Sequence, residues 1–191
     1  MTHVAEEGNR RIGGMTGAEI TQSVVDVEGW FKKHAGGCLD NAEGAREAGK
    51  HQQAALEKAA DANIPEELRS VMSIQDGQLW FSEKQALTCK EMVLESVRME
   101  RVHGWRAGLI PFAKDLDDTL LVTDTHAKGC PVTEWDADGE GTTVANTFSM
   151  FLEGFRNELL SGRCEYVEGL GVIEKISKNS ASSPRNNNSR K

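Results

Sequence analysis

Apolar residues return at helical spacing soon after the start of the chain. Thr16 and Glu19 have the spacing of a capping box, in which the threonine hydroxyl accepts an N–H of the first turn and the glutamate reaches back. The apolar positions that follow are Ile20, Val24, Val27 and Phe31. Their spacing predicts an amphipathic helix that ends near the Ala-Gly-Gly sequence at 35–37.

Two segments of different character follow. Residues 40–61 are rich in Ala, Glu and Lys and contain few large apolar side chains, so we expect any helix there to be mostly solvated. The sequence "NIPEELRSVMSIQDG" predicts a short helix, because Asn63 can cap it and Pro65 stands in the first turn, where a missing N–H breaks no hydrogen bond. Gly77 marks its end.

A short strand and another helix come next. In "QLWF", Leu79 and Phe81 alternate onto one face, which predicts a strand. Both "SEKQ" and "TCKE" fit a capping box, so the following helix begins near Ser82 or near Thr88. We expect it to end at about Arg101.

The pattern then changes to short apolar runs between Asp and Gly turns, which is typical of strands. These runs lie in "GLIPFAKDLDDTLLVTD" and "CPVTEWDADGEGTTVA". A last helix is predicted by an apolar stripe at helical spacing, and Gly162 closes it. The stripe consists of Phe148, Phe151, Leu152, Phe155 and Leu159. The final extended segment is "RCEYVEGLGVIEKI".

Length and composition indicate one soluble domain. The chain has 191 residues, 38% of them hydrophobic, which is enough for one hydrophobic core. No apolar run approaches the roughly 20 residues of a membrane span. Residues 1–15 lack the apolar stretch of a secretory signal and contain two acids that argue against a transit peptide. We therefore expect a flexible N-terminus over 1–15, a cytoplasmic location and no membrane binding.

Charge is unevenly distributed along the chain. The net charge is −8, but the segment from residue 175 onward carries five basic residues and no acid, so the remainder is near −8 − 5 = −13. A body that acidic repels phosphate backbones, and we therefore expect no nucleic-acid partner. Residues 177–191 have too few apolar side chains to form a core, which predicts a disordered basic tail.

The cysteines and histidines form no recognisable site. Cys38, Cys89, Cys130 and Cys164 are far apart, and the five histidines are scattered. Without a secretion signal, separated cysteines of this kind are more often buried thiols than a disulfide framework or a zinc site. We expect no metal and no cofactor.

The sequence "DLDDT" matches the Asp-x-Asp-x-Thr loop of haloacid dehalogenase-type phosphatases, in which the first Asp attacks phosphorus and the second moves the proton. Asp115, Asp117 and Thr119 have this spacing. That loop follows a buried parallel strand, whereas here Pro111 interrupts the apolar run and Lys114 adjoins the would-be nucleophile. We expect a coincidental match and a hairpin turn.

The second acidic turn, "DADGEGTTVANT", imitates the first half of a calcium loop. Asp136, Asp138, Glu140 and Gly141 fit an EF-hand, but the twelfth position holds Thr147 instead of a bidentate glutamate. No helix is predicted before it. An Asp-Gly hairpin turn accounts for the same residues, and we expect that turn.

Four tryptophans are candidates for packing or for binding. Trp30 and Trp80 lie on apolar faces of predicted elements, so we expect them in the core. Trp105 and Trp135 flank the two acidic turns and could be partly exposed anchors of a binding surface. For each of them alone, a core position is the commoner alternative.

The order of these elements resembles the SUKH superfamily, which includes fungal cell-wall-synthesis regulators and many bacterial toxin-immunity proteins. The strongest matches are "IPFAKD" with "LLVTD", the Val-x-x-Trp-Asp sequence in "VTEWD", and the phenylalanine-rich helix with its trailing "EYVEGLG". They span Leu109 to Glu174, and weaker agreement extends back to Trp30.

The resemblance implies an α+β domain over residues 16–176, with a twisted, mainly antiparallel sheet and helices packed around it. Residues 111–124 would be two paired strands joined by an acidic turn. The resemblance also implies a protein–protein interaction module rather than an enzyme. The chain departs from the family pattern in "DLDDT", which replaces a glycine-containing turn, and in a helical insertion at about 40–61.

We predict that this module is an adaptor or scaffold protein whose docking surface is the acidic turn region. Between Phe112 and Thr142 there are eight acids and two bases. The acids would steer a basic protein partner, and the tryptophans would anchor it. The predicted residues are Trp105, Asp115, Asp117, Asp118, Trp135, Asp136 and Asp138.

Three alternatives stay open. The chain could be a structural subunit of a larger scaffold or cytoskeletal assembly, which would place it at the cytoskeleton. It could be a toxin-immunity protein with a cognate toxin. It could also be a magnesium-dependent phosphatase that uses Asp115 and Asp117.

Overall fold

The computed structural model describes residues 15–36, 49–74 and 76–175. Residues 1–14 of the expected flexible N-terminus, residues 40–48 of the expected insertion and the expected basic tail at 177–191 lie outside these ranges. Within the described ranges, no helix has both the length and the apolar character that crossing a membrane requires.

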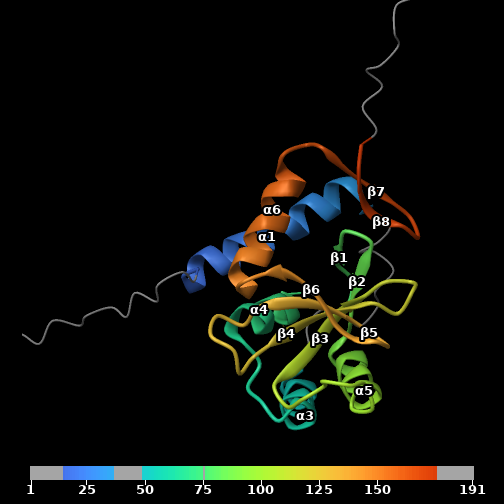
Figure 1. Cartoon of the computed structure of the whole chain (residues 1–191). Helices are drawn as coiled ribbons and strands as arrows, with labels where there is room; N and C mark the ends of the chain where they lie inside the picture. Colours follow the sequence, from blue (N-terminus) through green and yellow to red (C-terminus); the bar gives the residue numbers. More distant parts are fainter. Residues whose placement is uncertain (1–14, 37–48, 75, 176–191) are drawn as a thin grey trace, which may run out of the picture.

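A six-stranded antiparallel sheet forms the centre of the fold, and its strands lie side by side in sequence order (Figure 1). They are β1 (Trp80–Phe81), β2 (Lys84–Ala86), β3 (Leu109–Lys114), β4 (Leu120–Asp124), β5 (Val132–Asp136) and β6 (Gly139–Ala145). A separate hairpin is formed by β7 (Cys164–Val167) and β8 (Gly171–Glu174). The predicted α+β class with a mainly antiparallel sheet is confirmed.

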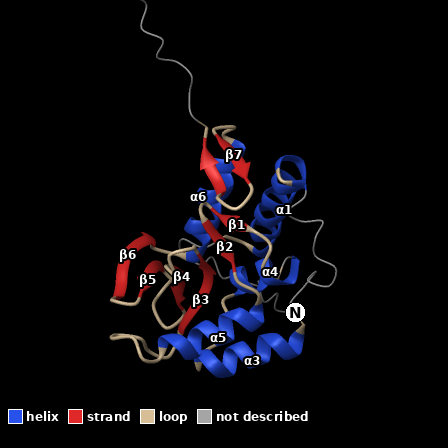
Figure 2. Cartoon of the chain, turned by 90° about the vertical axis from the view of Figure 1, so that its right-hand side faces the viewer, coloured by secondary structure: helices blue, strands red, loops and turns tan. Residues whose placement is uncertain are grey.

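Helices cover both faces of this sheet. The described helices are α1 (Gly17–His34), α3 (Lys50–Ala60), α4 (Glu66–Ile74), α5 (Cys89–Met99) and α6 (Phe148–Leu160). The helices α1, α4 and α6 gather on one face, while α3 and α5 pack together on the other (Figure 2). The part of the expected insertion that is described therefore forms α3, and its buried residues are Leu56 and Ala60.

The predicted capping boxes begin α1 and α5. Thr16 Oγ1 accepts the N–H of Glu19 at 3.3 Å, and Thr16 donates its own N–H to the Glu19 carboxylate at 2.7 Å. Of the two candidate starts of α5, the structure uses Thr88. Ser82 instead lies in the turn between β1 and β2, where its φ of 57° is incompatible with a helix.

The strand β3 is buried along most of its length because helices cover both faces of the sheet. Its pairing with β4 is antiparallel, so residues 111–124 form a hairpin, as the resemblance implies. Pro111 pairs with Val122 next to an irregularity between Pro111 and Ala113. Such a bulge accommodates a residue that has no N–H to donate to the ladder.

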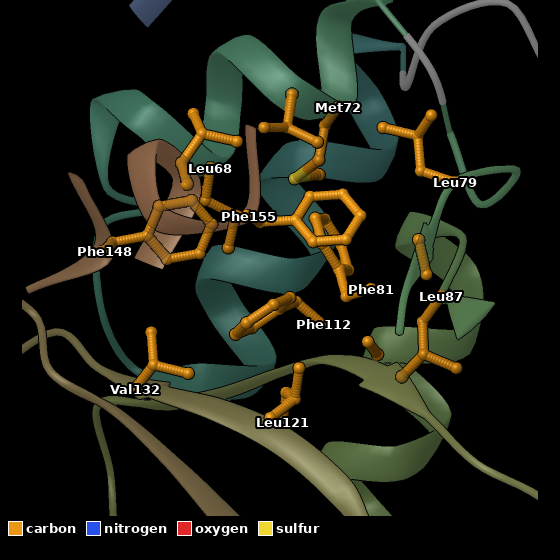
Figure 3. Close-up of a cluster of buried hydrophobic side chains, with 14 of the residues drawn as sticks. Leu68, Met72, Leu79, Phe81, Leu87, Phe112, Leu121, Val132, Phe148 and Phe155 are labelled. Atoms are coloured by element: carbon orange, nitrogen blue, oxygen red, sulfur yellow. The ribbon is translucent and has the colours of Figure 1, made fainter. Parts of the chain in front are cut away.

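Phenylalanines from three elements meet in the core between α4, α6 and the sheet (Figure 3). The ring centroids of Phe81 and Phe112 are 5.8 Å apart, and those of Phe112 and Phe148 are 5.1 Å apart. The buried residues of the predicted stripe on α6 are Phe148, Leu152, Phe155 and Leu159. This stripe is confirmed, and it packs α6 against one face of the sheet.

Candidate partner-binding surface

The antiparallel meander brings three turns to one end of the sheet. Neighbouring strands run in opposite directions, so the turns that follow β1, β3 and β5 lie at the same end. The register agrees with this, because Gln85 pairs with Lys114 and Leu120 pairs with Trp135. We call the carboxylates of these turns the acidic edge. It consists of Glu83, Asp115, Asp117, Asp118, Asp136 and Asp138.

A buried lysine joins two of these turns to β5. Lys84 is 5% exposed, and its Nζ lies 2.6 Å from Glu83 Oε1 and 3.2 Å from both Asp115 Oδ2 and Glu134 Oε1. Burial by itself lowers the pKa of Lys84, but the hydrogen bonds to the three carboxylates outweigh it and raise the pKa. The lysine therefore stays charged and ties the strands β2, β3 and β5 together.

Asp115 has a structural role in the turn between β3 and β4. Its Oδ1 accepts the backbone N–H groups of Asp117 at 3.0 Å and Thr119 at 2.9 Å, while Oδ2 contacts Lys84. Both oxygens are thus engaged, in a hairpin of antiparallel strands. The Asp-x-Asp-x-Thr spacing reflects an Asx-type turn, in which an aspartate side chain bonds to the backbone that follows it.

The other two aspartates of this turn are exposed. The Asp118 carboxylate lies 3.0 Å from Lys114 Nζ, and this hydrogen bond lowers the pKa of Asp118. Lys114 also contacts Glu95 of α5 at 2.9 Å. Lys84 and Lys114 therefore offset the charge of Glu83, Asp115 and Asp118. Among the described residues, no salt bridge involves the other three carboxylates of the acidic edge, Asp117, Asp136 and Asp138.

The turn between β5 and β6 is a hairpin turn, as predicted. Asp136 Oδ1 accepts the N–H of Asp138 at 2.7 Å, and Asp136 pairs with Gly139 across the turn. Gly139 has a φ of 120°, which favours glycine. Both Asp136 and Asp138 are exposed. In the part of the chain that the structure describes, no group of three or more His, Cys, Asp or Glu side chains could hold a metal ion.

The two tryptophans lie together, but they are not two exposed anchors. Trp135 is only 1% exposed, and its Nε1 donates to Thr133 Oγ1 at 2.9 Å. Trp105 is half-buried and stacks edge-on against Trp135, with ring centroids 5.2 Å apart. The expectation of a partly exposed Trp135 is wrong, because β5 lies inside the sheet and the segment before β3 covers its indole.

Sequence patterns did not predict the roles of Lys84, Glu83 and Glu134. The available signal was the position of Lys84 two residues before the buried Ala86, which places it on the inner face of a strand. A lysine at such a position needs acidic partners, because a buried charge without them is costly. The identity of those partners follows only from the sheet order.

Comparison with known proteins identifies the family. The model of the SMI1 / KNR4 family (SUKH-1) matches residues 49–154, which is more than half of the chain and reaches from α3 into α6. This range contains the whole acidic edge. A search of curated proteins gave no match. The suspected resemblance to the SUKH superfamily is confirmed, and the chain belongs to the SMI1 / KNR4 family (SUKH-1).

Proposed function

We propose that the chain is a protein-binding module and that a basic partner protein docks on the acidic edge. The observation that carries this proposal is the charge at this end of the sheet. Asp117, Asp136 and Asp138 are exposed there, and the nearby Lys84 and Lys114 are already paired with acids. A surface of one sign speeds association with a partner of the opposite sign.

Membership of this family suggests a toxin-immunity role or a regulatory role in cell-wall synthesis. In either role the domain would act by holding another protein. The two roles differ in the partner. In the toxin-immunity role the partner is a toxin, and its activity should fall when the chain is co-expressed with it. The adaptor, scaffold and cytoskeletal roles stay predictions from the sequence, as does the cytoplasmic location.

We also propose that the chain does not catalyse phosphoryl transfer. Asp115 would have to release both its backbone hydrogen bonds and Lys84 before it could act as a nucleophile. The expected result is no magnesium-dependent turnover of p-nitrophenyl phosphate. Turnover that disappears in Asp115→Asn would instead establish the phosphatase alternative.

The test of the docking surface is a double charge reversal, Asp117→Lys with Asp138→Lys. Both side chains are exposed, so the fold should be retained. Glu153→Lys with Glu165→Lys changes the net charge equally at exposed sites outside the three turns and serves as the matched control.

The partner is first captured from native lysate with the tagged wild-type chain, and its association rate is then measured for each variant. At low salt the reversal should slow association by about tenfold and remove most of its salt dependence, while the control leaves both unchanged. Equal rates for the reversal and the wild type would exclude the acidic edge as the docking surface.

A further inference from the structure

A groove lies between α6 and the sheet and adjoins the acidic edge. Its volume is about 320 Å³, and residues from α6, β6 and the turn between β1 and β2 line it. Its apolar lining includes the buried side chains of Phe81, Leu121 and Phe155. A recess of this size is large enough for one aliphatic side chain of another protein.

Two large apolar side chains on the walls of this groove are exposed. Val144 of β6 is 46% exposed, and Met150 of α6 is 52% exposed. A methionine adapts its shape to different apolar neighbours, which suits a binding surface. Exposed apolar side chains around a recess are typical of interaction sites.

The charged residues around the groove favour a basic occupant. Glu83, Glu134 and Glu158 line it, and the one lysine that lines it, Lys84, is 5% exposed and paired with acids. The groove therefore has a net negative charge. Two of its acids, Glu83 and Glu134, belong to the same ion-pair cluster as Asp115 of the acidic edge.

A glycine in the middle of α6 keeps one wall of the groove open. Gly154 lines the groove, is exposed, and a Cβ at this position would meet no atom within 4 Å. Packing therefore does not require glycine here. Glycine also destabilises a helix interior relative to alanine. Because Gly154 lines the groove, a longer side chain at this position would narrow it.

We propose that an extended basic segment of a partner protein inserts one aliphatic side chain into this groove beside Gly154. Its Lys or Arg residues would pair with Glu83, Glu134 and Glu158. This inference rests on the proposed function, a module that binds a basic protein. It adds the apolar anchor that Trp135 cannot supply, because Trp135 is buried.

The test uses two synthetic peptides on the full chain. One is acetyl-Lys-Arg-Leu-Arg-Lys-amide, and the other has Ser in place of Leu. Binding is followed by NMR of the backbone amides and of the Val144 and Met150 methyl groups. The Leu peptide should shift these methyl resonances and bind about fivefold more tightly than the Ser peptide, because only Leu can enter the groove.

A variant that fills the groove sharpens the test. Gly154→Leu should lower the affinity for the Leu peptide to that for the Ser peptide. Gly29→Leu is the matched control, because Gly29 is also exposed within a helix and a Cβ there meets nothing within 4 Å. Unfolding curves of both variants verify that each is folded, and Gly29→Leu should bind like the wild type.

The outcomes separate the two proposals. Equal affinity for both peptides, with shifts confined to the acidic edge, would overturn the groove and leave the proposed function standing. No shift at either place would overturn both. Methyl shifts that depend on protein concentration without peptide would show that a second copy of the chain occupies the groove, which overturns the partner assigned here.

Discussion

Replacement of Lys84 by methionine should destabilise the domain. The ammonium group lies 2.6 Å from Glu83 and 3.2 Å from Asp115 and Glu134, so the substitution removes the shared cation of three carboxylates. Methionine retains the unbranched stem, and the change therefore acts mainly on charge. The remaining acids would repel one another with no buried partner.

The magnitude follows from the exposure of those acids. Removal of one partner from a fully buried ion pair costs about 3–5 kcal/mol. Here the side chains of Glu83 and Glu134 are 59% and 36% exposed, so water solvates both once the lysine is gone. Only the side chain of Asp115, which is 15% exposed, is largely shielded from water. We expect a loss of about 2 kcal/mol at pH 7.

The loss should depend on pH with a definite sign. Burial acts to raise the pKa of Glu83, but the hydrogen bond and the charge of Lys84, together with a backbone hydrogen bond, outweigh it, so the pKa of this carboxyl lies below its usual 4.5. Such a group contributes stability above pH 4.5, and the contribution is lost as pH falls through the lower folded value. In Lys84→Met, protonation instead relieves repulsion. The difference between variant and wild type should therefore be largest near neutral pH and shrink below pH 4.5.

The assay is urea unfolding followed by tryptophan fluorescence, at pH 7 and at about pH 4. Lys90→Met is the control, because Lys90 is exposed on α5 and the substitution changes the net charge equally. An unfolding free energy of Lys84→Met within about 0.5 kcal/mol of this control at pH 7 would show that the lysine contributes no stability. An equal loss at both pH values would show that the carboxylates around it do not set the loss.

Two further predictions concern the start of α5. Thr88→Ala should lower the unfolding free energy by about 1 kcal/mol, because Thr88 Oγ1 accepts the N–H of Glu91 at 3.2 Å; an unchanged melting temperature would contradict the cap. Asp76→Asn should leave the domain as stable as the wild type or more so at pH 7. Burial raises the pKa of Asp76, and its carboxylate accepts the N–H of Cys89 at 2.7 Å, a bond that asparagine can keep. Because the pKa of Asp76 is raised in the folded state, its ionisation costs stability at pH values above that pKa. The stability gained by Asp76→Asn should therefore vanish as pH falls toward 3.8, the usual pKa of an aspartate. Denaturation curves that show a loss of stability at pH 7 would mean that the charge is required.

The candidate site was predictable where a turn contains its own acids. Asp136 and Asp138 stand in a recognisable Asp-Gly turn, and Asp117 and Asp118 lie in a polar break between two apolar runs. The groove was not predictable in the same way. Gly154 and Val144 are ten residues apart on different elements, and only the packing of α6 beside β6 places both on one recess.

Local patterns in the sequence determined the helix that begins after Thr16, the strands on either side of "DLDDT" and the apolar stripe of α6. Caps, turns and periodicity act between residues a few positions apart, so they are visible in the chain itself. The tertiary structure alone decided that Trp135 is covered and that Lys84 meets Asp115 and Glu134. Such contacts depend on which strands become neighbours, and that order is a property of the whole folded sheet rather than of any segment.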